Sequence, residues 1–202
     1  MSVRSAFMVL AALAAATPVA MRAQEPEVDF AQARKQFVAG QARAAAQTLV
    51  MSSLAVRQQV GRCRDMDVGS RLLDAESQLE KLATSIGNGK VTSVKVLDKA
   101  LTEVDLVLAR HHLELAIANM AHPRAADIPV MSQDIDRGAY HYERSITLSG
   151  GALAPDQATA VNDARELVKT IDSTNAIPAG GMLVVQALQK LVIGASTVAS
   201  QP

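Results

Sequence analysis

Apolar residues recur every three or four positions along most of this chain, which is the spacing of one face of an α-helix. Runs that alternate between apolar and polar residues, which are typical of β-strands, are nearly absent. The pattern therefore predicts an all-α fold, with a single domain over residues 24–202. We expect a bundle of about six to seven helices, built from antiparallel helical hairpins.

Glycines, prolines and capping residues divide this pattern into segments. The expected helices run from about Phe30 to Gly40 and over residues 41–60, 67–86, 93–120, 127–149, 155–175 and 182–194. Asp127 is the expected cap of the fifth helix. This choice places Pro129 in the first turn, where its missing N–H is harmless.

The longest expected helix, residues 93–120, carries two apolar rows. The first row is Leu97, Leu101, Val104, Leu108, His111 and Leu115, and the second is Leu106, Leu113 and Ile117. A helix that faces solvent on one side needs only one apolar face. Two rows therefore predict that this helix is buried on more than one side.

Two other helices are candidate contact faces for a partner protein. The helix over residues 41–60 has an expected inward face of mostly small residues: Ala42, Ala45, Ala46, Leu49, Leu54 and Val56. The helix over residues 182–194 has only Gln186, Gln189 and Lys190 as polar residues. Such an apolar helix needs burial, either in the core or against a partner.

The first 23 residues have the organisation of a secretory signal peptide. Arg4 precedes an apolar run at residues 6–16, and a polar break then ends at the small residue Ala23. A membrane span needs about 20 apolar residues, so this run is too short to be an anchor. We expect cleavage after Ala23, or alternatively after Ala20. The mature protein would then be periplasmic or secreted, without stable membrane insertion.

Composition excludes several classes of function. The chain has 20 Lys and Arg against 20 Asp and Glu and contains no Trp, so we expect no nucleic-acid binding. Cys63 is the single cysteine, which rules out an internal disulfide, and we expect it to act as a small hydrophobic residue near a helix end. Motifs of zincins, di-iron bundles, covalent haem proteins, serine hydrolases and phosphate loops are missing. We therefore expect no enzymatic activity.

A polar stripe crosses the helix over residues 93–120 at intervals of seven: Asp98, Asp105, His112 and Asn119. Inside a bundle, this spacing aligns carboxylates and an imidazole along one seam between helices. The next helix has a second polar line: Asp134, Arg137, His141 and Ser145. Antiparallel packing of the two helices would bring His112 and His141 together.

Two functional hypotheses follow. The first is an exported, non-enzymatic bundle that acts through an unknown protein partner, as an accessory, scaffold or envelope stress-response protein, and that needs no cofactor. The alternative is a bundle that holds a transition metal or haem, with His112, His141 and either Asp105 or Asp134 as ligands. Under the first hypothesis, the same residues form a hydrogen-bonded seam that fixes how the helices align.

Overall fold

The computed structural model describes residues 29–199. Within this range it has seven α-helices, one short 3₁₀ helix and no β-strand, which confirms the all-α prediction. The elements are α1 (Phe30–Val38), α2 (Ala42–Val60), α3 (Met66–Gly87), α4 (Val94–Ala121), η1 (Ala125–Asp127), α5 (Ile128–Leu148), α6 (Pro155–Thr174) and α7 (Gly181–Ala199). The expected leader and both candidate cleavage positions lie outside the described residues.

Local sequence signals set several helix ends. The side chains of Asp29 and Ser93 accept hydrogen bonds from backbone N–H groups in the first turns of α1 and α4. Gly40 adopts a φ of +74°, which allows a tight turn between α1 and α2. Pro129 lies in the first turn of α5 with Asp127 as the preceding cap residue, as expected.

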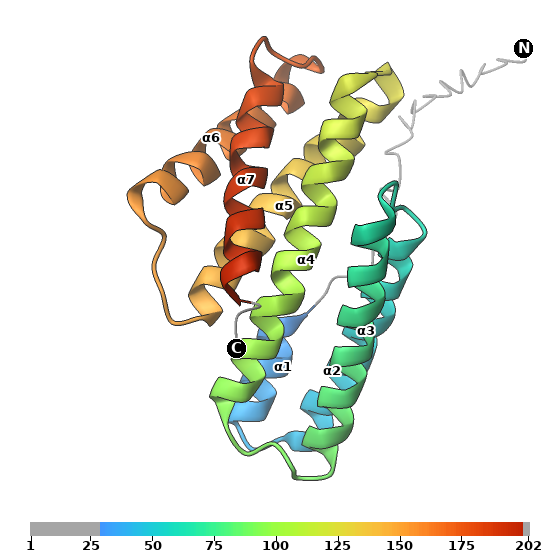
Figure 1. Ribbon diagram of the computed structural model, residues 1–202, viewed down its shortest axis with the longest axis vertical. Coiled ribbons are helices and arrows are strands. Elements are labelled where there is room, and N and C mark those ends of the chain that lie inside the picture. The colour runs from blue at the N-terminus through green and yellow to red at the C-terminus, as the bar shows by residue number, and fades with distance from the viewer. Residues whose placement is uncertain (1–28, 200–202) are drawn as a thin grey trace, which may run out of the picture.

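Helix α4 is the central element of the bundle. Figure 1 shows it running through the middle of the molecule, with α2 and α3 on one side, α6 and α7 on the other, and α1 behind its lower end. Its first apolar row packs with α1, α2 and α3 in one core cluster, through Leu97, Leu101, Val104 and Leu108. Leu106 and Leu113 of the second row pack with α5, α6 and α7 in another cluster. Helix α4 is therefore buried on more than one side, as the sequence predicts, and the structure adds that its two rows pack against different sets of helices.

Helix α7 is a core helix. Val185, Leu188 and Val192 are fully buried in the second cluster. The helix continues beyond Gly194, where its end was expected, to Ala199. Gly194 keeps a helical backbone, and the next residue, Ala195, packs against the cluster, so packing extends the helix past the glycine.

The inward face of α2 also differs from the expectation in one residue. Leu54 is 45% exposed, whereas Leu49 and Val56 are buried. Leu54 follows Leu49 by five positions, which places it about 140° around the helix from Leu49. It therefore belongs to the outer surface of α2.

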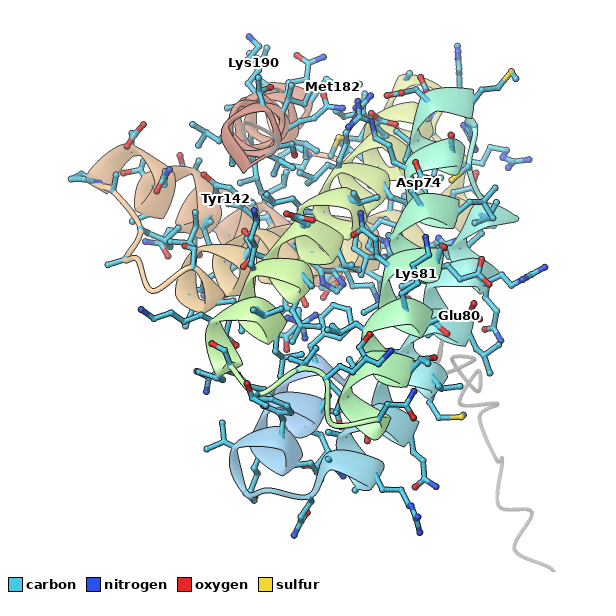
Figure 2. All side chains as sticks on the ribbon, turned by 60° about the horizontal axis from the view of Figure 1, so that its bottom comes forward. Asp74, Glu80, Lys81, Tyr142, Met182 and Lys190 are labelled. Carbon is cyan, nitrogen blue, oxygen red and sulfur yellow. The ribbon has the colours of Figure 1, made fainter. Side chains whose placement is uncertain are left out.

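Charged side chains cover outer faces of the bundle. Figure 2 shows Asp74, Glu80 and Lys81 pointing away from the bundle along α3, and Lys190 pointing outward from α7. No helix between residues 29 and 199 is long and apolar enough to cross a membrane.

Candidate functional site

Helices α4 and α5 pack closely and antiparallel at the level of the predicted histidines. The backbone of Gly138 leaves no room for a side chain, because an added Cβ would lie 2.6 Å from Cγ of Leu113. At this level the rings of His112 and His141 are parallel within 3°, with centroids 5.8 Å apart. The expectation that the two histidines meet is confirmed.

Asp105 of α4 is fully buried and binds two side chains of α5. The Nδ1–H of His141 donates to Oδ1 of Asp105 at 2.8 Å, and Nε of Arg144 donates to Oδ2 at 2.8 Å. The guanidinium of Arg144 also lies over the rings of Phe30 and Tyr140, 4.8 and 4.9 Å from their centroids. A buried carboxylate needs this kind of compensation, because desolvation of an unpaired charge is costly.

Asp134 of α5 has a matching environment. The Nδ1–H of His112 donates to its Oδ1 at 2.9 Å, and Arg62 donates to its Oδ2 at 3.1 Å. Arg62 lies in the loop between α2 and α3, so this carboxylate connects three parts of the chain. Asp105 and Asp134 thus each bind one imidazole and one guanidinium.

The outer positions of the stripe are paired as well. Arg34 of α1 donates to Asp98 at 2.7 Å, and Arg64 of the α2–α3 loop donates to Asn119 at 2.9 Å. We call the four stripe residues of α4, together with these two partners and with Asp134, His141, Arg144 and Arg62, the polar seam. The seam joins α4 to α1, to α5 and to the loop between α2 and α3.

Burial keeps the imidazoles of His141 and His111 uncharged at neutral pH, because it lowers the pKa of both side chains. It lowers the pKa of His141 to about 4, even though the hydrogen bond to Asp105 acts in the opposite direction. Burial also lowers the pKa of His111 to about 3, and the neighbouring His112 and Arg62 add to this effect. Since Nδ1–H of His141 donates to a carboxylate, its lone pair resides on Nε2.

His111 is a third buried histidine, and it contacts Cys63. Its Nδ1 lies 3.4 Å from Sγ of Cys63, within hydrogen-bonding distance for sulfur. Nε2 of His111 is buried and has no hydrogen-bond partner among residues 29–199. Burial raises the pKa of the half-buried Cys63, and the charges of Glu114 and Asp65 raise it further. The pair is therefore a protonated thiol beside a neutral imidazole.

The four proposed metal ligands lie close together, but the two carboxylates do not occupy the same kind of position as the two imidazoles. The two imidazoles face each other, and Asp105 and Asp134 lie behind them at Nδ1 while also binding arginines. In the described part of the chain, no group of three His, Cys, Asp or Glu side chains is placed to hold a metal ion. Within this geometry the carboxylates orient the imidazoles.

The sequence interpretation missed the arginines of the seam and the contact of Cys63. Arg144 follows His141 by three residues and so shares its face of α5, a spacing that could have identified it. Arg34 and Arg62 belong to other elements, and no local pattern connects them with α4. Cys63 was expected to act as a small hydrophobic residue near a helix end; it packs partly buried against the first core cluster, and its thiol also contacts His111.

Comparison with known proteins assigns no family. No family model matches the sequence, and neither a curated protein nor a solved structure matches the chain. The functional proposals below therefore depend on the sequence and on the geometry of the described residues.

Proposed function

We propose that this protein is exported and acts without catalysing a reaction, by binding another protein through an apolar row on α2. The row consists of Val50, Met51 and Leu54, with exposed fractions of 43%, 65% and 45%. Three large apolar side chains within five residues of one helix form a local patch, which is a feature of interaction surfaces. Covering such a patch gains about 25 cal/mol for each Å² of apolar surface removed from water. This row is the observation that carries the proposal.

The polar seam supports the same proposal. Its buried carboxylates, Asp105 and Asp134, are each bound by an arginine and a histidine, which leaves neither poised to act as a general base. These contacts hold α4, α5 and the α2–α3 loop in one arrangement, which presents α2 on a fixed scaffold. The pattern of residues 1–23 supports export.

Site-specific photocrosslinking in the cell envelope tests this function. A photoreactive residue at Met51 or Leu54 is expected to give a discrete adduct with one other protein, and Leu54→Glu should remove the adduct formed at Met51. Asp163, an exposed residue of α6, provides the control position and should give none. Absence of any adduct from α2, or the same adducts from α6, would contradict the proposal.

Binding of a transition metal or haem is a second candidate function, and one observation favours it. His112 and His141 each direct Nδ1–H to a buried carboxylate, as metal-binding histidines commonly do, and this leaves Nε2 available for ligation. In this version Asp105 and Asp134 orient the ligands. The group would be held by the two imidazoles.

Elemental analysis and an optical spectrum distinguish this candidate. The protein is recovered from the envelope without chelator and without a metal-affinity tag. Stoichiometric metal or a haem band that disappears in both His112→Ala and His141→Ala would support ligation at the seam. Protein free of metal and haem would contradict it and leave the protein-binding proposal unaffected.

A further inference from the structure

Two residues of the apolar row on α2 belong to a longer line of exposed residues along that helix. The line advances by four and three residues in alternation, which is the spacing of a contact between two packed helices. Its members, which we call the α2 stripe, are Arg43, Gln47, Val50, Leu54 and Arg57. The two apolar positions therefore lie between two arginines, which are about 21 Å apart along the helix axis.

This order of residues indicates the chemistry of the partner. We propose that the α2 stripe binds an amphipathic helix whose apolar positions lie between two carboxylates. The inference rests on the proposed protein-binding function and names the class of its partner. A helix that crosses α2 at a shallow angle contacts each position of the stripe in turn. Its apolar positions would cover Val50 and Leu54, and a carboxylate at each end would face an arginine.

The charge of this part of the molecule favours an acidic partner. Between residues 30 and 64 the chain has six Lys and Arg and no Asp or Glu. Arg43 is exposed and has no ion pair within residues 29–199. Nη1 of Arg57 donates to Glu76 of α3 at 2.8 Å, but the arginine side chain is 66% exposed, and a guanidinium has five N–H donors. Both arginines can therefore bind a carboxylate from outside.

A second copy of this chain does not match the α2 stripe. In an antiparallel pair of α2 helices with Val50 against Leu54, Arg57 of each copy lies about one turn from Arg43 of the other. In a parallel pair, identical arginines face each other. Helix α2 has no Asp or Glu to compensate these like charges. The stripe thus favours a helix of opposite charge over its own copy.

Designed helical peptides test this charge preference with the purified full chain. Three labelled, alanine-rich peptides share leucines at the two central positions and carry glutamate, glutamine or lysine at both ends. In fluorescence anisotropy at low salt, the glutamate peptide is expected to bind about 10-fold more tightly than the lysine peptide, and the glutamine peptide with intermediate affinity. Added salt should reduce this difference, because it screens exposed charges.

Reversal of one charge on the stripe should reverse the preference. Arg43→Glu breaks no ion pair among the described residues, so the fold is expected to be retained. It should weaken binding of the glutamate peptide by about 5-fold and strengthen binding of the lysine peptide. Lys190→Glu is the matched control, since it makes the same change of charge on α7, where Figure 2 shows Lys190 pointing outward. It should alter neither affinity.

Several results would overturn the inference. They are the absence of binding by the glutamate peptide, equal affinities for the three peptides, and an unchanged preference in Arg43→Glu. A dimer of the chain that dissociates in Leu54→Glu would show that a second copy covers α2. Binding to vesicles that contain phosphatidylglycerol, if lost in Leu54→Glu, would assign the stripe to a lipid surface.

Photocrosslinking in the cell envelope separates this inference from the function on which it rests. An adduct at Met51 that disappears in Arg43→Glu but persists in Lys190→Glu is the expected result. An adduct that persists in Arg43→Glu would show that α2 binds a protein without using this charge, so the inference alone would fail. Absence of an adduct in the unsubstituted protein would remove the protein-binding function as well.

Discussion

Two antiparallel hairpins of this bundle, α2–α3 and α4–α5, bury their interfaces with different chemistry. Between α2 and α3 the buried side chains are largely aliphatic, and Leu49 and Val56 lie in the same core cluster as Leu72 and Leu79. Their inter-helix ion pair, between Arg57 and Glu76, involves an arginine that is 66% exposed. Between α4 and α5, by contrast, charged and titratable groups occupy the interior.

The two kinds of interface differ in how strictly they fix the position of one helix along the other. Aliphatic side chains stabilise two helices at several relative positions, whereas a buried carboxylate is tolerated only where its partners reach it. A shift of α5 along α4 would separate Asp105 from Arg144 and His112 from Asp134 together. We infer that the seam fixes the alignment of α4 and α5, and that this interface is therefore the more sensitive one to acid and to substitution.

Acidification is expected to lower the free energy of unfolding more than any other change, because it protonates buried histidines of α4 and α5. The unfolded chain protonates its histidines near pH 6.5, whereas folded His141 and His111 resist protonation until about pH 4 and 3. The unfolded state thus binds more protons between these values, so stability is complete above about pH 6.5 and falls as the pH decreases. The expected loss by pH 4 is on the order of 5 kcal/mol. Urea unfolding in the presence of a chelator, from pH 7 to 4, measures it.

A histidine substitution sharpens this test. His141→Gln should reduce the slope of stability against pH, because it removes one of the two depressed imidazoles. His122→Gln, at an exposed position, should leave the slope unchanged. A flat stability profile between pH 7 and 4 would show that the buried histidines do not couple folding to protonation.

Removal of one seam carboxylate is expected to cause the next largest loss in the free energy of unfolding. Asp105→Asn keeps the shape of the side chain but leaves Arg144, whose side chain is 11% exposed, without its counter-charge. We expect a loss of about 3–5 kcal/mol in the free energy of unfolding. Asp67→Asn removes the partner of two arginines at an exposed position and should cost only a small fraction of this loss. Equal losses in denaturant titrations would remove the distinction between buried and exposed pairs.

Much of the fold is encoded locally, which is why the sequence predicts it. The two apolar rows of α4, the cap at Ser93 and the position of Pro129 depend on residues within a few turns of one helix. The end of α7 does not: Gly194 weakens a helix, yet α7 continues through it to Ala199, and Ala195, the residue after the glycine, packs against the second cluster. Where tertiary contacts override propensity, the local pattern predicts the helix but misplaces its end.

The candidate site, too, has one part that the local sequence predicts and another that it does not. The stripe from Asp98 to Asn119 lies on one helix, and the line containing His141 lies on the next, so their meeting follows from an antiparallel hairpin. The partners that give the seam its charge balance come from α1 and from the α2–α3 loop, through Arg34 and Arg62. No spacing along the chain relates these residues to α4. Their contribution required the three-dimensional arrangement.

Alanine substitutions at two helical glycines compare the two hairpins directly, with the smallest expected effect. At Gly138, a Cβ would lie within 2.6 Å of Leu113, so α5 must move from α4 or Leu113 must change rotamer. We expect Gly138→Ala to lose about 1–2 kcal/mol, after the gain in helix propensity is subtracted. At Gly69 of α3, the nearest atom is Cβ of Cys63 at 3.7 Å, an ordinary contact.

Gly69→Ala is therefore expected to stabilise the protein by up to about 1 kcal/mol, because alanine has the higher helix propensity and no neighbour has to move. Thermal and urea unfolding followed by circular dichroism measure both variants under the same conditions. Opposite signs would establish that the contact between α4 and α5 has no spare volume at the level of the histidines. A stabilised Gly138→Ala would mean instead that Leu113 or α5 moves at little cost in free energy, and the contact between α4 and α5 would then have spare volume at this level.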